Sequence, residues 1–193
     1  MIVRYLTHPQ VMIDPDVPVM KWGLNELGAS RVTRLIKSDR LSGTTYVVSS
    51  GEQKALDTAR PIAAAIGCEL DVRARTHEND RSATGYLPGP EFEATADAFF
   101  AEPDVSVRGW EKAVDAQSRI VGEVEEVLVG PVGGDVLIVG HGAVGTLLYC
   151  HLARLPISRQ YDQTGGGGGC LFSFDINTRV PHSHWQTIEE FIA

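Results

Sequence analysis

The stretch Val3-Arg4-Tyr5-Leu6-Thr7-His8-Pro9-Gln10 predicts a short β-strand that ends on a histidine. Its apolar and aromatic side chains suit a half-buried strand, and Pro9 cannot donate to a β-ladder, so the strand should stop near His8. In open α/β sheets, ligands bind outside the carboxyl ends of the strands. A single histidine at such a position is usually a loop residue with no functional role. His8 therefore becomes a candidate functional residue only because a second histidine occupies an equivalent position.

That second histidine is His141. It follows Asp135-Val136-Leu137-Ile138-Val139, an apolar strand of the kind that parallel sheets bury on both faces. Strand and helix patterns alternate along the chain, which predicts a three-layer α/β/α fold with a mostly parallel central sheet. We expect a single domain over residues 1–193, in which the irregular residues 73–110 form an insertion that covers a pocket.

The remaining elements are predicted from periodicity and from end signals. Asn25 should cap one helix, Ser50 should cap the next, and Gly67 should end that second helix. The expected helices cover residues 25–38, 52–65, 91–101, 110–129 and 143–152, and the further strands cover residues 44–49, 68–72 and 170–175.

Composition narrows the class of protein. Apolar residues make up 43% of the chain and charged residues 22%, as in ordinary soluble globular proteins. A net charge of −8 without a basic run argues against nucleic acid or an anionic membrane as a partner, and no apolar stretch reaches the ~20 residues that a membrane-spanning helix needs. The scattered Cys68, Cys150 and Cys170 and the absence of a signal-peptide pattern fit a cytoplasmic protein, either a monomer or a homodimer.

Two cofactor patterns can be weighed against the sequence. Gly140-x-Gly142-x-x-Gly145 matches the dinucleotide-binding fingerprint by letter, but residues 156–162 are polar and lack the second strand that this fingerprint requires ~20 residues on. The six histidines include no HExxH spacing, and His182 and His184 are expected to form a solvated loop pair. We therefore predict no cofactor and no metal, and keep a metal-dependent hydrolase as a less favoured alternative.

Taken together, these motifs resemble the histidine phosphatase superfamily, whose members have a phosphoglycerate-mutase-like α/β fold. Thr7-His8-Pro9 stands where that family has Arg-His-Gly, and Gly140-His141-Gly142 matches its late Gly-His-Gly in full. Residues 49–59 are similar to Ser-Ser-x-x-x-Arg-Ala-x-x-Thr-Ala, residues 76–82 to Leu-x-Glu-x-Asp-x-Gly, and residues 22–28 to Pro-Leu-Thr-x-x-Gly. The order and spacing of five matches over nearly the whole chain are more specific than any one of them.

The resemblance implies a metal-independent phosphatase that hydrolyses a small phosphomonoester through a phosphohistidine on His8. His141 would donate to the phosphoryl oxygens. Glu78 would protonate the leaving oxygen and then help to activate water, with Asp80 as the substitute. Mutase activity is less favoured, because the sequence shows no clear insert that would hold a bisphosphorylated sugar-acid.

The departures from the family pattern concern the phosphate-binding residues. Thr7 and Lys54 replace two family arginines, and the loss of one bidentate clamp would cost ~2–4 kcal/mol of transition-state stabilisation. Lys54 keeps the charge but not the fork geometry, and Arg81 is the expected replacement. We therefore expect Thr7, Lys54, Arg81 and Gly142 to bind phosphate, while the glycine run of residues 164–169 either adds amides or is a flexible turn. A catalytically weakened phosphate-ligand binder on the same fold remains the main alternative.

Overall fold

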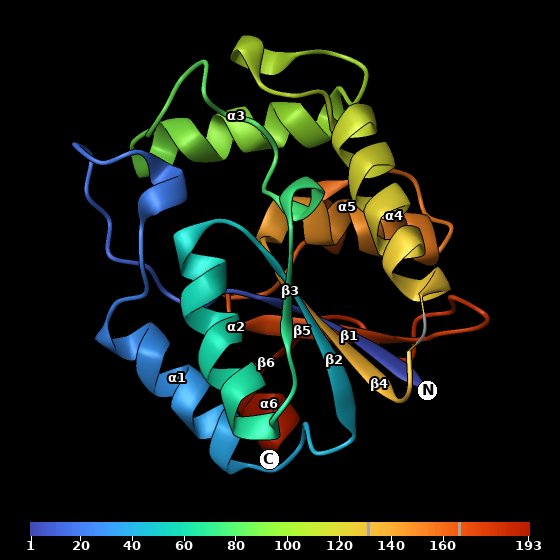
Figure 1. Ribbon diagram of the computed structural model, residues 1–193. Coiled ribbons are helices and arrows are strands. Elements are labelled where there is room, and N and C mark those ends of the chain that lie inside the picture. Colours follow the sequence, from blue (N-terminus) through green and yellow to red (C-terminus); the bar gives the residue numbers. More distant parts are fainter. Residues whose placement is uncertain (131, 166) are drawn as a thin grey trace.

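The computed structural model describes residues 1–130, 132–165 and 167–193. Over these residues, six strands form one sheet in the order β3-β2-β4-β1-β5-β6 (Figure 1). The pairs β1–β4, β2–β4 and β2–β3 are parallel, and β5 and β6 add antiparallel pairs at one edge. The predicted mostly parallel α/β sheet is therefore confirmed. The strands are β1 (Ile2–Thr7), β2 (Thr44–Ser50), β3 (Leu70–Arg73), β4 (Asp135–Gly140), β5 (Cys170–Asp175) and β6 (Gln186–Thr187).

Helices cover both faces of this sheet (Figure 1). One face packs against α1 (Glu26–Lys37), α2 (Gln53–Ile66) and α6 (Ile188–Ile192). The other face packs against α4 (Ala113–Val129) and α5 (Gly142–Leu152). The remaining helix, α3 (Gly89–Ala101), belongs to the segment between β3 and α4 and crosses the top of the molecule in this view.

Strand β4 is buried on both faces, which explains its uninterrupted apolar sequence. Val136 and Ile138 pack into the core under α4 and α5, whereas Leu137 and Val139 pack into the core under α1 and α2. All four side chains have no exposed surface. A central parallel strand must be apolar on both faces, because apolar burial of this kind is the dominant favourable contribution to folding.

Two of the three predicted end signals are confirmed. The Asn25 side chain accepts a backbone hydrogen bond at the start of α1, and Gly67 ends α2 in the left-handed conformation with φ 76°. The prediction for Ser50 is wrong. Ser50 is the last residue of β2, and the N-cap position of α2 falls on Glu52, which makes no side-chain cap bond. The strand runs further than its β-branched residues indicate, so the helix begins later.

The sequence reasoning assigned no element after residue 175, where β6 and α6 lie. Both elements are too short for periodicity to be visible. The sequence signal for α6 is a capping box. The Thr187 side chain accepts a hydrogen bond from the Glu190 backbone N–H, and the Glu190 carboxylate accepts one from the Thr187 backbone N–H. His182 and His184, just before it, are exposed as expected. No helix within the described residues combines the length and the apolar character needed to cross a membrane.

Arg31 of α1 connects three segments that are distant in sequence. Its buried guanidinium donates to the Gln10 side chain (3.1 Å), to the carbonyl oxygens of Gly168 (2.8 Å) and Gly169 (3.0 Å), and to the Glu189 carboxylate (2.7 Å). The loop after β1, the described part of the glycine run and the C-terminal helix α6 are therefore joined at one side chain.

Candidate active site

His8 and His141 lie side by side at the carboxyl edge of the sheet. β1 and β4 are paired in parallel with Thr7 opposite Gly140, so the residues that follow them are neighbours. The two imidazole ring centroids are 5.3 Å apart and the ring planes are inclined by 67°. The strand-end argument from the sequence thus leads to two residues that the fold brings together.

The ring of His8 is oriented by the backbone next to it. Its Nδ1 lies 2.9 Å from the carbonyl oxygen of Pro9, and because a carbonyl only accepts, this contact places the ring proton on Nδ1 and leaves a lone pair on Nε2. Burial lowers the pKa of His8 to about 4, so the imidazole is neutral at pH 7. A neutral, oriented imidazole is the form that a nucleophile requires.

The backbone of His8 is fixed by its neighbours on both sides. Its N–H donates to the carbonyl of Gly140 (3.0 Å), and its own carbonyl accepts from Gly169 (3.0 Å). Gly168 has φ 73°, and a Cβ on it would lie 2.1 Å from the His8 carbonyl oxygen. Glycine is therefore required at this position for the chain to pass so close to His8. Gly166 of the same run lies outside the described residues, so the expectation of phosphate-binding amides stays a prediction there.

His141 is entirely buried at the N-terminus of α5. Its Nε2 lies 2.8 Å from Ser50 Oγ and 3.5 Å from Glu52 Oε1, and its backbone N–H and C=O both bond to the Tyr5 hydroxyl at 3.1 Å. Burial lowers the pKa of His141 to about 3. Its Nδ1 has no hydrogen-bond partner among the described residues, which is uncommon for a buried polar atom and leaves this nitrogen available to a ligand.

Glu78 lies against the same helix terminus. Its carboxylate accepts from the backbone N–H groups of Ala143 (3.3 Å) and Val144 (3.1 Å) in the first turn of α5, and from that of Asn79 (3.1 Å). Helix N-termini stabilise negative charge through these free amides. The predicted acid is thus placed next to the helix that begins at His141.

The loop that carries Glu78 is fixed by Arg119 of α4. Arg119 donates to the carbonyl oxygens of Arg75 (2.7 Å), His77 (3.0 Å) and Glu78 (3.3 Å), and its guanidinium also pairs with Glu111. Because three carbonyls are bound by one side chain, the loop conformation depends on α4 as well as on its own sequence.

Asp80, the substitute for Glu78, has a different environment. Its carboxylate accepts a backbone hydrogen bond from Ser82 (2.8 Å), which lowers the pKa of Asp80 and holds it in the charged form. Unlike Glu78, it makes no contact with the N-terminus of α5 among the described residues. Its position favours Glu78 over Asp80 as the proton donor, a role that remains a prediction.

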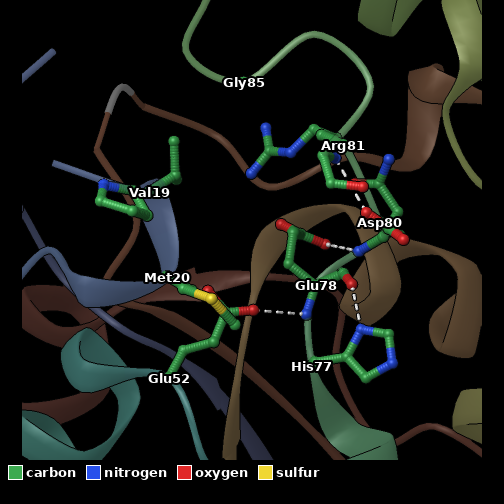
Figure 2. Close-up of a pocket in the computed structure, with 11 residues that line it drawn as sticks. Val19, Met20, Glu52, His77, Glu78, Asp80, Arg81 and Gly85 are labelled. Carbon is green, nitrogen blue, oxygen red and sulfur yellow. Dashed lines mark hydrogen bonds between the residues drawn. The ribbon is translucent and has the colours of Figure 1, made fainter. Parts of the chain in front are cut away.

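Glu52 was not among the predicted site residues, yet it connects several of them. One carboxylate oxygen accepts from the backbone N–H of Glu78 (3.0 Å, Figure 2), and the other pairs with Lys54 Nζ (2.5 Å). Burial raises the pKa of Glu52, but the neighbouring His141 and Lys54 outweigh it and lower the pKa to about 2. Lys54 also donates to the carbonyl of Val19 (3.0 Å) and is 3% exposed. The predicted phosphate-binding lysine is therefore already paired with an internal carboxylate.

The hydroxyl of Thr7 is used inside the protein. It lies 2.8 Å from Gln163 Oε1 and 3.1 Å from the Cys170 carbonyl, and it accepts from the Cys170 backbone N–H (3.0 Å). Gly142 is close to the same glutamine, since a Cβ on it would lie 2.5 Å from Gln163 Nε2. Thr7 thus ties β1 to β5, and Gln163 lies next to both predicted phosphate-binding positions.

A cavity of about 650 Å³ opens beside Glu52 and Glu78 (Figure 2). Arg81 lines it, with its guanidinium carbon 5.2 Å from the ring centroid of Phe92 and 5.6 Å from that of Trp110. Among the described residues, no hydrogen bond or ion pair engages the Arg81 side chain, so its charge is available to an anion. The residues that line the cavity are Pro18, Val19, Met20, Glu52, His77, Glu78, Asn79, Asp80, Arg81, Ser82 and Gly85.

The site as a whole contains residues that sequence reasoning missed. Ser50 and Glu52 lie within the motif of residues 49–59, but no local pattern indicates that their side chains reach His141. Tyr5 and Gln163 carry no local signal, because their contacts depend on which strands and loops become neighbours. No group of three or more His, Cys, Asp or Glu side chains placed to hold a metal is found in the part of the chain that the structure describes.

The paired histidines and the α/β sheet agree with a match between this sequence and a known protein family. The family profile of the histidine phosphatase superfamily (branch 1) matches residues 12–182, so the chain belongs to this superfamily. The matched region contains Glu78 and His141 and begins just after His8. The search among curated proteins found no significant match.

Solved structures with the same fold are numerous. The native structure of a mycobacterial glucosyl-3-phosphoglycerate phosphatase matches with a TM-score of 0.75 and 22% identity, covering 98% of this chain and 93% of that one. YhfR from Bacillus stearothermophilus matches with a TM-score of 0.81 and 18% identity over 100% and 99% of the two chains. A putative alpha-ribazole-5'-P phosphatase from Escherichia coli matches with a TM-score of 0.73 and 16% identity over 94% and 93%. At these identities the likeness establishes the phosphoglycerate-mutase-like fold.

Proposed function

We propose that the protein is a metal-independent phosphatase that hydrolyses a small phosphomonoester through a phosphohistidine on His8. The observation that carries this proposal is the state of the His8 ring: neutral, oriented by the Pro9 carbonyl through Nδ1, and 5.3 Å from a second buried imidazole. Membership of the superfamily and the phosphatase names of two similar structures support the same reaction.

In the first half-reaction, the lone pair of His8 Nε2 attacks phosphorus and the bond from phosphorus to the alcohol oxygen breaks. Glu78 gives a proton to that oxygen, and the α5 amides stabilise the carboxylate that remains. The neutral His141 donates a hydrogen bond to the phosphoryl oxygens from its unpartnered Nδ1, and Arg81 supplies positive charge.

In the second half-reaction, Glu78 accepts a proton from water as the water oxygen attacks phosphorus. The bond from phosphorus to His8 Nε2 breaks, and the electron pair returns to the imidazole. Inorganic phosphate leaves, and His8 is again neutral with its proton on Nδ1. The cycle consumes one water molecule and needs no metal or redox partner.

The experiment compares wild type with His8→Ala on p-nitrophenyl phosphate, in the presence of a chelator. We expect turnover in the wild type, an acid-labile phosphoryl group trapped on the protein after rapid quenching, and loss of both in His8→Ala. The exposed His182→Ala serves as the matched histidine control and should retain full activity. Activity in His8→Ala equal to that of the wild type would contradict the phosphohistidine route, and activity that requires an added divalent metal would favour the metal-dependent hydrolase.

A second candidate function is a phosphate-ligand binder on the same fold. It is favoured by the ion pair of Glu52 with Lys54, which occupies the cation expected to bind phosphate, and by the internal use of the Thr7 hydroxyl. Such a protein would be stabilised against heat by phosphate or vanadate but would trap no acid-labile phosphate. The quench experiment therefore separates the two functions.

A further inference from the structure

We propose that the alcohol part of the substrate is a flat apolar group, in the simplest case a phenyl ring, which binds in a second cavity next to the charged one. This inference rests on the proposed phosphatase function. The second cavity has a volume of about 270 Å³. Its lining residues are Ile13, Val19, Trp22, Arg81, Gly85, Tyr86, Leu87, Gly89 and Phe92.

The two cavities are neighbours that share a wall. Val19, Arg81 and Gly85 line both of them. A ligand with two chemically different halves therefore fits the pair: its anionic half lies in the first cavity, between Arg81 and Glu78, and its other half lies in the second cavity. The phosphorus-oxygen bond that breaks in the proposed reaction would lie between the halves.

The second cavity has the chemistry of an apolar subsite. Among the described residues no carboxylate lines it, and its side chains are aliphatic or aromatic apart from the Arg81 guanidinium and the Tyr86 hydroxyl. The Trp22 indole N–H is already bonded to the carbonyl oxygens of Asp14 (2.9 Å) and Val17 (3.0 Å), so the ring offers only an apolar face. The Trp22 and Tyr86 rings are tilted with their centroids 5.6 Å apart, so they pack against each other, and a further ring can pack against the side of this pair that faces the cavity.

The exposed surface at this cavity gives a driving force for binding. Ile13 is 58% exposed and Tyr86 is 37% exposed, so apolar surface that is now in water would be covered by an apolar ligand. A sugar or polyol in the same place would lose many hydrogen bonds to water, and among the lining side chains only Arg81 and the Tyr86 hydroxyl could replace them. The lining therefore discriminates for aromatic and against polyhydroxylated alcohols.

Arg81 joins the two halves of the site. Its guanidinium lies over the Phe92 ring at 5.2 Å and also faces the charged cavity. In that position its N–H groups can donate to an oxygen of the phosphoryl group while the ligand ring lies beside it, against the same aromatic wall that includes Phe92. An arginine placed between an anion site and an aromatic site matches an aryl or arylalkyl phosphomonoester.

The test compares substrates whose leaving oxygens are chemically alike, so that leaving-group reactivity does not produce the preference. Hydrolysis of 2-phenylethyl phosphate, ethyl phosphate and glycerol 3-phosphate is measured for the wild type. We expect kcat/KM for 2-phenylethyl phosphate to exceed that for ethyl phosphate about tenfold or more, as burial of a phenyl ring implies, and glycerol 3-phosphate to be no better than ethyl phosphate. In Tyr86→Ala and Ile13→Ala the ratio of the first two values should fall at least threefold, whereas Val180→Ala, which removes an exposed apolar side chain elsewhere, should keep it.

Binding of two non-hydrolysable analogues separates this inference from the proposed reaction. 2-Phenylethylphosphonate and ethylphosphonate are titrated by calorimetry into the wild type and Tyr86→Ala. Tighter binding of the phenyl compound, weakened by Tyr86→Ala, supports the subsite even if no phosphate ester is hydrolysed, in which case only the phosphatase proposal fails. Equal binding of the two analogues, or a preference for glycerol 3-phosphate among the esters, would overturn the subsite while leaving hydrolysis through His8 intact.

Discussion

The two walls of the site are built in different ways. The inner wall consists of His8 and His141, which follow paired parallel strands and have their backbones fixed by neighbouring strands and by Tyr5. The outer wall consists of residues 77–92, which belong to the segment between β3 and α4 and whose first two residues are held by Arg119. The position of His8, the proposed nucleophile, thus depends on sheet register, whereas the shape of the cavity depends on loop contacts.

The walls also differ in charge. Both imidazoles of the inner wall are neutral at pH 7 because burial lowers their pKa values to about 4 and about 3. The outer wall carries charged groups, among them the carboxylate of Asp80 and the guanidinium of Arg81. We infer that the inner wall performs the chemistry and that the outer wall supplies protons, charge and selectivity. Each prediction below tests this division.

The largest effect is expected at the inner wall. His8→Asn keeps a polar side chain of similar size but removes the nucleophilic nitrogen, so kcat should fall by about three orders of magnitude or more. Phosphatase kinetics measure the loss, and circular dichroism checks that the fold is retained. Residual activity within tenfold of the wild type would place the chemistry in the outer wall instead.

The next effect concerns the proton donor of the outer wall. Glu78→Gln removes the transferable proton, and kcat for ethyl phosphate should fall about 10²–10⁴-fold. The loss should be smaller for p-nitrophenyl phosphate, whose leaving group needs no protonation. Asp80→Asn is the matched control, and a larger loss in that variant than in Glu78→Gln would assign the acid to Asp80.

A smaller effect is expected where the walls meet. Glu52→Gln removes the anion that pairs with Lys54, which frees the lysine charge for an external anion, so vanadate should inhibit about tenfold more strongly than in the wild type. Inhibition constants at pH 7 measure the change. Glu69→Gln, an exposed carboxylate, is the control. Weaker inhibition in Glu52→Gln would mean that Glu52 holds Lys54 in its useful position.

The smallest effect is on stability and depends on pH. The folded-state pKa of His8, about 4, lies below the ordinary value of 6.5, so the unfolded chain binds more protons between these values. The free energy of unfolding should therefore fall as the pH is lowered from about 6.5 towards 4. His8→Asn should show a shallower fall in thermal-denaturation scans over this range. Equal slopes in the two proteins would show that His8 is not desolvated.

Sequence reasoning succeeded where a residue's place depends on the regular part of the fold. A strand pattern followed by a histidine was enough to put His8 and His141 at one edge, because the ends of neighbouring parallel strands must meet there. It also selected Arg81, which lines the cavity. It failed for Glu52 and Gln163, whose contacts with His141 and Thr7 bring together separate segments of the chain. The partner of a side chain at the tip of a loop is set by packing, which no local pattern records.

Arg31 has a consequence for the dynamics of the protein. Because its guanidinium binds Gln10, Gly168, Gly169 and Glu189 at once, the last helix cannot detach without leaving a buried charge unpaired next to the segment that holds the His8 carbonyl. The bonds from Gly169 N to His8 O and from Ile188 N to Gly169 O continue the same connection. These segments should therefore open as one cooperative unit, so that slow amide hydrogen exchange at the C-terminal helix reports on the order of the loop that carries His8.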